Sequence, residues 1–592
     1  MVVTVGPGTF EPSLPTGSRL PSVGRVARVD GPVVELDGMP EVVRFEFVEV
    51  GQRRIPGEVI AIDGERVVAQ LYEYTGGLRV GEPARASGRP LTVRLGPGLL
   101  GGIYDGLLRP LAGAADFLPA RSLVRPPSGE HEVCPCVAVG DEVGPGDVLA
   151  EVGDPSGLQH LLVVPTDLAG RVESVVPSGV HGEDESIARI GGRDVTLASE
   201  WPIRRPRPYV ERRLERAPFV TGQRVLDVLV PIASGSSATV IGGFGEGKTM
   251  LLEQLAKWGG ADVIVYVGCG ERGNELADLI DELVHLDDPR TGRSLSERTI
   301  ILANTSNMPV MAREASIYTA VTIGEYYRDM GLHAVIVADS TSRWAEARRE
   351  LSSRTGAIPA EQGYPADLPV SLATFYQRAG RVTTVGGRIG SVTIVTSVSP
   401  PGGDVTEPVS AHTQRFVQAV WALDRDLAYA RHYPAISWTR SFTRDAESVG
   451  RWHAEHDDPD WAVRRRRLLA LLDEADRLRG IADLVGVGAL PAEDRVTLLA
   501  ARLAQEAVLQ QSALSEHDAF CPLPKQTALV TAVLDVFDVA RELAAGGTPA
   551  SVIEEVDVAP LIRAKDELAA DDAGGVARVA GELVARFREV AQ

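Results

Sequence analysis

A short apolar stretch followed by glycines, a lysine and a threonine is the part of the sequence that points most directly to chemistry. Eight consecutive residues fit the pattern G-x-x-x-x-G-K-[ST]: Gly242, Gly243, Phe244, Gly245, Glu246, Gly247, Lys248 and Thr249. A strand is expected before them and a helix after them, so that backbone N–H groups and the helix N-terminus surround a phosphate. Lys248 would then contact the β- and γ-phosphates of a nucleotide, and the hydroxyl of Thr249 would bind Mg²⁺.

An ordinary glycine turn is the alternative interpretation of this segment. It is disfavoured because the helix dipole opposes a lysine at the start of a helix unless an anion lies there. Glu246 is unusual in this setting, since its carboxylate lies inside a loop that should attract phosphate. We expect the Glu246 side chain to point outward or to pair with a cation.

Three further residue types are needed for phosphoanhydride chemistry: a metal holder, a group that orients water, and cations near the transferred phosphate. Asp339 ends the apolar run HAVIVADS and is expected to hold Mg²⁺, partly from the second sphere. Glu271 follows the run VIVYVGCG and could polarise water, and Arg272 beside it could contact the γ-phosphate. Arg343, shortly after Asp339, is a second possible phosphate contact. Alone, Asp339 could cap a turn and Glu271 with Arg272 could be a surface ion pair, but their occurrence with Lys248 favours the functional interpretation.

Composition limits the class of protein. A chain of 592 residues predicts about three or four domains. No apolar run reaches the roughly 18 residues of a membrane span, and no charged segment precedes an apolar one at the N-terminus, so a soluble, unexported protein is expected. The net charge of −21 argues against a nucleic-acid partner. Cys134 and Cys136 lack partners at zinc spacing, and Cys269 and Cys521 are isolated, so free thiols are expected.

Changes in the sequence pattern divide the chain into five parts, which together predict a multidomain α/β protein. Residues 1–20 are rich in Pro, Gly and Ser and are expected to be disordered. Short alternating strands predict an N-terminal β-barrel over 21–92. A β-rich block over 110–203 resembles a biotinyl or lipoyl carrier but contains no lysine, so an inserted structural domain is expected. Apolar strands alternating with helices predict a parallel-sheet domain with a phosphate-binding loop over 210–438. Apolar residues at helical spacing predict a C-terminal helical domain over 439–592.

The barrel has an alternative interpretation, because an oligonucleotide-binding barrel would show a similar strand pattern. Such a barrel usually carries an excess of basic and aromatic residues, which this segment lacks. A structural collar is therefore favoured.

Eight segments between Gly242 and Pro522 together resemble one known family, in order and far more specifically than the phosphate loop alone. They are GGFGEGKT, YVGCGERGNE, NTSNMPVMAREASIYTAVTIGEYYRDMG, VADSTSRWAEARRE, EQGYPADLP, SVSPPGGDVTEP, ARHYPAISW and HDAFCP. The chain is similar to the catalytic A subunit of the V-type and archaeal-type rotary ATPases. The resemblance implies an N-terminal β-barrel, an inserted β-rich domain that the related F-type β subunit lacks, a P-loop NTPase (RecA-like) core and a C-terminal helical bundle.

Position by position, the resemblance implies roles for the residues of the phosphate loop and of the strand ends. Lys248 and Thr249 are expected to bind the phosphates of ATP or ADP and Mg²⁺. Glu271 is expected to activate water, and Asp339 to steady the metal.

The same resemblance implies four further contacts with the nucleotide. Arg272 and Arg343 are expected to contact the terminal phosphate. Tyr433 and Phe520 are expected to sandwich the adenine, because an aromatic pair binds a flat base well. Core packing is the alternative for both rings.

The resemblance also implies partners and a place in the cell. Proteins of this kind alternate with a non-catalytic B subunit in an A3B3 ring, where the B subunit supplies an arginine in trans. The ring is coupled through central and peripheral stalk subunits to a membrane sector that moves H⁺ or Na⁺. The chain is therefore expected at the cytoplasmic face of the cell membrane, in a peripheral soluble sector.

Two other functions remain open at this point. A homohexameric P-loop ATPase of secretion or RNA-translocase type could use Arg444 as its own finger, although the inserted block and the acidic charge oppose it. A nucleotide-binding protein without turnover is opposed by the presence of both Glu271 and Lys248.

Overall fold

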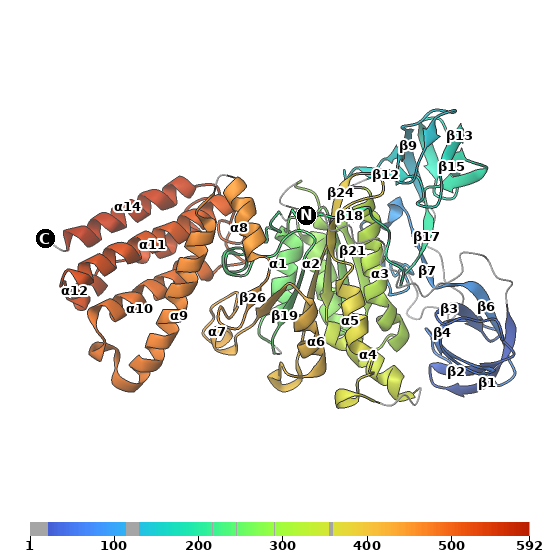
Figure 1. Ribbon diagram of the computed structural model, residues 1–592, viewed down its shortest axis with the longest axis horizontal. Coiled ribbons are helices and arrows are strands. Elements are labelled where there is room, and N and C mark those ends of the chain that lie inside the picture. Colours follow the sequence, from blue (N-terminus) through green and yellow to red (C-terminus); the bar gives the residue numbers. More distant parts are fainter. Residues whose placement is uncertain are drawn as a thin grey trace.

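The computed structural model describes residues 22–113, 129–154, 156–215, 217–243, 245–288, 291–354, 359–456 and 458–590. The described chain is elongated, with a bundle of helices at one end, a β-barrel at the other and a parallel sheet covered by helices between them (Figure 1). Residues 1–20, expected to be disordered, lie outside the described residues.

Six strands close the N-terminal barrel in the order β1-β2-β5-β4-β3-β6. Alternate residues such as Val48 and Val50 point inward and are fully buried, which is the period-2 pattern that the sequence shows. The predicted N-terminal β-barrel is therefore confirmed. Its strands are β1 (Val23–Asp30), β2 (Val33–Asp37), β3 (Glu46–Val50), β4 (Ile55–Asp63), β5 (Arg66–Leu71) and β6 (Pro83–Pro90).

The inserted β-rich domain is reached through an antiparallel ribbon of β7 (Thr92–Leu95) and β17 (Ser199–Pro202). It consists of two four-stranded sheets packed on a common apolar core and projects away from the body of the molecule (Figure 1). One sheet contains β12 (His160–Val163), β11 (Val148–Val152), β9 (Glu130–Pro135) and β14 (Gly179–Gly182). The other contains β10 (Glu142–Val143), β13 (Gly170–Val175), β15 (Ser186–Ile190) and β16 (Arg193–Thr196).

The central sheet has the order β26-β25-β19-β24-β22-β20-β21-β8, with β23 and β18 attached beside β24. Its parallel strands are β8 (Ile103–Tyr104), β19 (Ser237–Ile241), β20 (Val263–Cys269), β21 (Thr299–Asn304), β22 (His333–Asp339), β24 (Ile389–Val398) and β25 (Ala419–Ala422). The antiparallel members are β18 (Glu211–Arg212), β23 (Gly380–Thr383) and β26 (Phe442–Thr443). Strands β8 and β26 lie outside the range 210–438 that the sequence pattern assigns to this domain, because two-residue strands carry too little periodicity to be recognised.

Helices cover both faces of the central sheet, as expected for parallel strands that are buried throughout. Almost every residue of α3 is buried, because this helix packs against the sheet on one side and the inserted domain on another. The helices are α1 (Lys248–Trp258), α2 (Gly273–His285), α3 (Val310–Asp329), α4 (Thr341–Arg354), α5 (Leu368–Tyr376), α6 (Pro408–Phe416) and α7 (Arg425–Tyr429).

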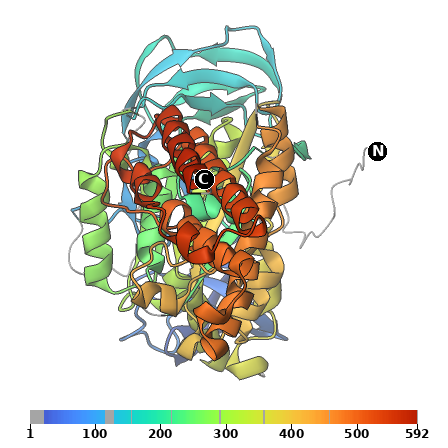
Figure 2. The ribbon, with the colours of Figure 1, turned by 90° about the vertical axis from the view of Figure 1, so that its left-hand side faces the viewer.

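The C-terminal part is helical, as predicted, and shares one hydrophobic core with the neighbouring α/β domain. Seen from its own end, it lies in front of the central sheet, with the inserted domain above and the barrel below (Figure 2). No helix in the described part of the chain combines the length and apolarity needed to cross a membrane. Its helices are α8 (Ala446–Glu455), α9 (Trp461–Val485), α10 (Ala492–Ala504), α11 (Leu523–Ala545), α12 (Ala550–Glu554), α13 (Ala559–Glu567) and α14 (Ala573–Glu589).

Candidate functional site

The loop between β19 and α1 has the strand, turn and helix arrangement of a phosphate-binding loop. Gly245 and Gly247 have φ angles of +79° and +95°, which L-residues with side chains rarely adopt. Gly247 is the N-cap of α1, and Lys248 is its first residue. Phe244, expected in the same loop, lies outside the described residues.

Two charged side chains of this loop fold back onto its own backbone. Lys248 Nζ donates to the carbonyl oxygens of Gly242 and Gly243 at 2.9 and 2.5 Å. Glu246 Oε2 accepts the N–H of Gly243 at 2.7 Å, so the Glu246 side chain turns back onto the loop rather than outward. Its negative charge also helps to raise the pKa of the Arg425 guanidinium. Burial lowers the pKa of Lys248, and the charges of Asp339, Glu246 and Glu271 oppose that shift.

A hydroxyl and a carboxylate meet where the sequence predicts Mg²⁺ binding. Thr249 Oγ1 donates to Asp339 Oδ2 at 3.1 Å, and the hydroxyl of Ser397 donates to Asp339 Oδ1. Asp339 is the last residue of β22 and is buried. Burial raises the pKa of its carboxyl, while the two hydroxyl groups and Lys248 lower it. Hydroxyl and carboxylate oxygens are the donors that Mg²⁺ prefers, so these residues fit the ion.

Glu271 lies in the turn after β20, beside the end of β22. Its position is held by Gly270, which has a φ of +78°, and by the Ser306 N–H, which donates to the Glu271 carbonyl at 2.9 Å. Burial, together with the negative charge of Asp339, raises the pKa of the Glu271 carboxyl to about 7. A carboxyl with such a pKa can both accept and release a proton near neutral pH.

The two candidate arginines lie at the rim of this site. Arg272 is the exposed N-cap residue of α2, with Nη1 3.6 Å from Glu275 Oε1. Arg343 Nη1 lies 2.9 Å from Glu346 Oε2, and half of the Arg343 side chain is exposed. Both guanidinium groups form ion pairs of the exposed kind, which are weak, so they can turn toward a bound anion at small cost.

The two candidate aromatic residues lie at different parts of the α1 surface. A Cβ at Gly247 would lie 3.8 Å from Cε1 of Tyr433, which places the Tyr433 ring beside the phosphate loop. Phe520 stacks on Trp258, the last residue of α1, with ring centroids 5.3 Å apart. Trp258 therefore belongs to the surroundings of Phe520, although the sequence did not single it out.

Two further polar residues of the site were missed by sequence reasoning. Ser397 at the end of β24 holds Asp339, and Arg313 packs against Gly270 and donates to the Ser306 carbonyl at 3.0 Å. Both belong to segments that the sequence marks as a strand and a helix. The strand order β24-β22-β20 places Ser397 beside Asp339, and the packing of α3 places Arg313 against Gly270, next to Glu271.

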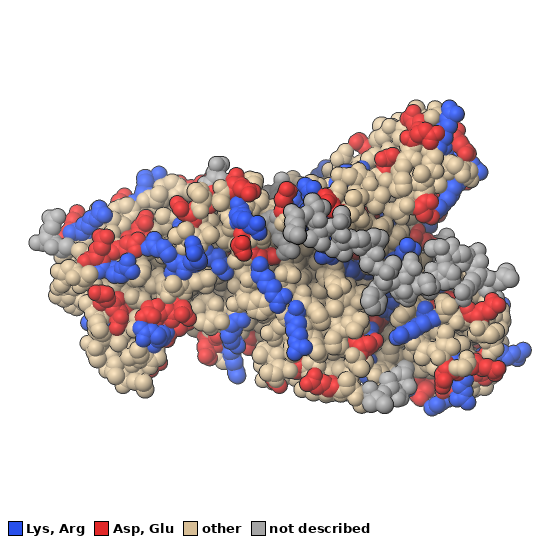
Figure 3. All heavy atoms as spheres, viewed as in Figure 1, with Lys and Arg blue, Asp and Glu red and all other residues tan. Residues whose placement is uncertain are grey.

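Charged side chains of both signs are interspersed on the face of the molecule drawn in Figure 3. Arg444 Nη1 donates to the carbonyl oxygens of Arg415 and Val417, at 3.4 and 3.1 Å, and so supports the end of α6. Cys134 and Cys136 are exposed free thiols, and Cys269 and Cys521 are buried free thiols. Within the described ranges, no group of three or more His, Cys, Asp or Glu residues could hold a metal ion.

Four family models match successive parts of the chain. They are the ATP synthase alpha/beta family beta-barrel domain over 22–88, the ATPsynthase alpha/beta subunit barrel-sandwich domain over 127–204, the ATP synthase alpha/beta family nucleotide-binding domain over 222–443 and the C-terminal domain of V and A type ATP synthase over 450–543.

Curated relatives match nearly the whole chain. The A subunit of the A-type ATP synthase of Staphylothermus marinus is 45% identical over 541 residues, which cover 90% of this chain and 91% of the relative. A V-type ATP synthase alpha chain of Halothermothrix orenii is 45% identical over 558 residues, which cover 92% and 95%. Among solved structures, the assembled ATPase EscN of the enteropathogenic E. coli type III secretion system has a TM-score of 0.63 at 22% identity, covering 86% of this chain and 100% of that one. At this identity the structural likeness concerns the fold alone.

Proposed function

The chain belongs to the ATP synthase alpha/beta family, in the group formed by the A subunits of A-type and the alpha chains of V-type ATP synthases, and we propose from this that it is the catalytic subunit of a rotary ATPase. Its reaction is the interconversion of ATP and water with ADP and phosphate, coupled to movement of H⁺ or Na⁺ across a membrane. The observation that supports this most directly is that Thr249, Asp339 and Glu271 lie at the carboxyl ends of the parallel strands β19, β22 and β20 of one sheet.

The phosphate loop would bind the β- and γ-phosphates of ATP. Lys248 would exchange the carbonyl oxygens of Gly242 and Gly243 for phosphate oxygens, since an ammonium group prefers an anionic acceptor. Thr249 and Asp339 would hold Mg²⁺, which when bound neutralises charge on the phosphates. Arg272 and Arg343 would contact the terminal phosphate, and Tyr433 and Phe520 the adenine.

Glu271 would act as the general base. The attacking water gives its proton to the Glu271 carboxylate while its oxygen bonds to the terminal phosphorus and the bond to ADP breaks. In the direction of synthesis the same carboxyl returns the proton. A pKa of about 7 suits both directions, because neither protonation state is strongly preferred at neutral pH.

Membership of the family supports an assembly in which this chain is one of several components. We propose that it alternates with a non-catalytic B subunit in an A3B3 ring at the cytoplasmic face of the membrane. Central and peripheral stalk subunits would connect the ring to the ion-translocating sector.

The decisive experiment measures Mg-ATPase activity and native mass of the purified chain, alone and mixed with its B partner. We expect activity only in a mixed three-plus-three ring. In that ring Glu271→Gln should retain nucleotide binding and lose turnover, because the amide cannot accept the proton of water. Full activity of the chain alone as a hexamer, or normal turnover of Glu271→Gln in the ring, would contradict the proposal.

A further inference from the structure

One buried glutamine contacts the backbone beside both aromatic residues of the proposed adenine pocket. The N–H of Gln511 donates to the carbonyl oxygen of Tyr433 at 2.8 Å. Its side-chain Nε2 donates to the carbonyl oxygens of Gly222 and Asp518, both at 2.7 Å. Gln511 is buried, so each of these contacts replaces a bond to water that the group has lost.

Gly222 in turn sets the position of Phe520. A Cβ at Gly222 would lie 2.1 Å from Cδ2 of Phe520, and the φ of Gly222 is +72°, so the ring rests directly on a bare backbone. The N–H of Cys521 donates to the Gly222 carbonyl at 3.0 Å, which fixes the residue after Phe520 to the same point. A displacement of Gly222 would therefore move the Phe520 ring with it.

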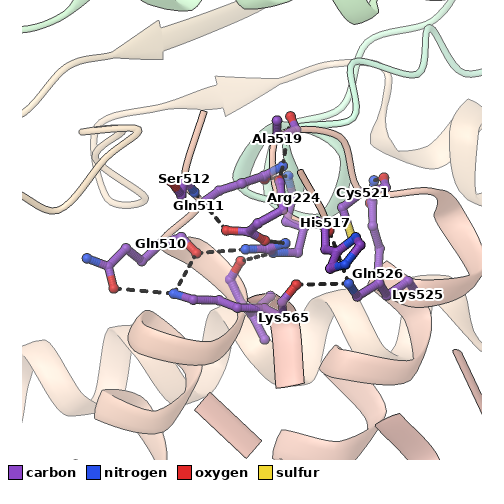
Figure 4. Close-up of polar contacts among 12 residues, drawn as sticks. Arg224, Gln510, Gln511, Ser512, His517, Ala519, Cys521, Lys525, Gln526 and Lys565 are labelled. Atoms are coloured by element: carbon purple, nitrogen blue, oxygen red, sulfur yellow. Dashed lines mark hydrogen bonds and ion pairs between the residues drawn. The ribbon is translucent and has the colours of Figure 1, made fainter. Parts of the chain in front are cut away.

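Arg224 ties this glycine segment to the loop that carries Gln511 (Figure 4). Its N–H donates to Gln511 Oε1 at 2.8 Å, its Nε to the Val508 carbonyl at 2.6 Å and its Nη2 to the Gln510 carbonyl at 2.7 Å. Its Nη1 forms an ion pair with Asp518, and both side chains are fully buried. Because these hydrogen bonds fix the orientation of the Arg224 guanidinium group, they also fix the position of the Gly222 segment relative to the loop that carries Gln511.

Two buried lysines hold the same loop from the side of the C-terminal helices. Lys565 Nζ donates to the carbonyl oxygens of Glu506 and Gln510 at 2.6 and 3.2 Å. Lys525 Nζ donates to the His517 carbonyl at 3.2 Å and to the Lys565 carbonyl at 2.8 Å. Figure 4 shows both ammonium groups reaching this loop from the helices below it. The loop of residues 510–522 is thus anchored on one side to the C-terminal domain and on the other to the start of the α/β domain.

We propose that Gln511 is a positioning residue for adenine. It fixes Gly222 and the Tyr433 backbone relative to each other, so that affinity for the base depends on how the C-terminal domain docks on the α/β domain. This inference rests on the proposed function, because it takes Tyr433 and Phe520 as the residues that hold the base. The hydrogen bonds of Gln511 described above lead to segments other than the phosphate loop of residues 242–249. Loss of its side chain should therefore weaken binding of the base and leave binding of the phosphates unchanged.

The test compares Mg-ATP with Mg-tripolyphosphate, which shares the phosphates and lacks the base, by calorimetric titration of the full chain. Gln511→Met keeps the size of the side chain and removes the side-chain hydrogen bonds to Arg224, Gly222 and Asp518, while the backbone bond to Tyr433 remains. We expect its Kd for ATP to rise about tenfold, equivalent to about 1.4 kcal/mol, while its Kd for tripolyphosphate changes less than about twofold. In the assembled ring the KM for ATP should rise and kcat should stay within about twofold.

Two more variants separate positioning from folding. Gln510→Met is the matched control, because the side-chain oxygen of Gln510 meets Lys565 rather than Gly222, and it should leave both affinities unchanged. Gln511→Glu keeps the acceptor for the Arg224 N–H and loses the donors to Gly222 and Asp518, so it should repeat the selective loss even if Gln511→Met does not fold.

Two results would contradict the proposed role of Gln511 and leave the proposed ATPase function unaffected. One is an equal loss of ATP and tripolyphosphate affinity in both folded Gln511 variants, and the other is an unchanged ATP affinity. A wild-type chain that bound neither ligand would instead contradict the proposed function, and the inference with it.

Discussion

The hydroxyl of Thr249 lies 3.1 Å from Oδ2 of Asp339, and this contact joins the first turn of α1 to the last residue of β22. These two residues are separated by 90 positions in the sequence, yet they meet because β19, which leads into α1, and β22 are parallel and flank β24. The contact brings together a hydroxyl and a buried carboxylate, whose oxygens suit a hard divalent cation.

Asp339→Asn should lower the affinity of the site for Mg²⁺. The neutral amide keeps the size of the side chain but removes the negative charge and one of the two acceptor oxygens, so the Mg²⁺ concentration for half-maximal activity should rise by at least about tenfold. Titration of ATPase activity with Mg²⁺ in the assembled ring measures this. Ser397→Ala should shift the same midpoint in the same direction by less, because it removes only one hydrogen bond to Asp339. An unchanged midpoint in Asp339→Asn would contradict the assignment.

The pH dependence of kcat/KM should report the Glu271 carboxyl. Since the ionised form accepts the proton of water, activity should rise with pH through a midpoint near the pKa of about 7. Glu275→Gln removes a negative charge that helps to raise this pKa, so its midpoint should move to lower pH. A pH profile that is identical in wild type and Glu275→Gln would show that another group is being titrated.

Glu246→Gln should increase the affinity for ADP. The amide keeps an acceptor for the Gly243 N–H, so the loop retains its shape, while a negative charge beside the phosphate groups disappears. We expect a decrease in Kd of about threefold to tenfold, which is typical for one charge near the protein surface. Calorimetry at two salt concentrations gives the measurement, because the effect should shrink as salt rises. Unaltered ADP affinity at low salt would mean that the carboxylate is remote from the bound phosphates.

The packing of the inserted domain against α3 should become less stable at low pH because of His160. Its Nε2 lies 3.0 Å from the hydroxyl oxygen of Tyr326 on α3, and burial lowers the pKa of His160 to about 3. Because the folded pKa lies below the unfolded value of about 6.5, the unfolded state binds more protons between these values, and stability is lost as pH falls below about 6.5. At pH 5 the cost is about 2 kcal/mol, and His160→Phe should remove it.

Hydrogen exchange of β9 to β16 at pH 5 and pH 7.5 measures this local stability without assuming that the whole chain unfolds in one step. His285→Phe on the exposed side of α2 is the control and should leave the pH dependence as it is. A difference between the two pH values that persists in His160→Phe would assign the acid sensitivity to other groups.

Arg444→Ala should have little effect on the mixed ring. The guanidinium group supports backbone carbonyls at the end of α6, so we expect less than about a twofold change in kcat and a small loss of stability. A loss of about a hundredfold or more in the ring would instead indicate a catalytic finger supplied by this chain.

Several features of the protein were determined by the sequence alone because they depend on neighbouring residues. The strand, glycine turn and lysine around Lys248 predict the loop between β19 and α1, and the inserted block, which contains no lysine, is predicted to be a structural domain. Alternating and helical apolar spacing predicted the barrel and the C-terminal helices, both of which are confirmed. Local periodicity is sufficient for such features, since each element buries one face of itself.

Other features were decided only by the tertiary structure because they depend on which distant segments lie side by side. Glu246 turns back to the Gly243 N–H rather than outward, Ser397 meets Asp339 only through the strand order, and Phe520 stacks on Trp258. Gln511 has no motif around it that marks a function, and its contacts with Tyr433 and Gly222 arise from the docking of the C-terminal domain on the start of the α/β domain. Such contacts satisfy buried polar groups across long separations in the chain, and no local pattern encodes them.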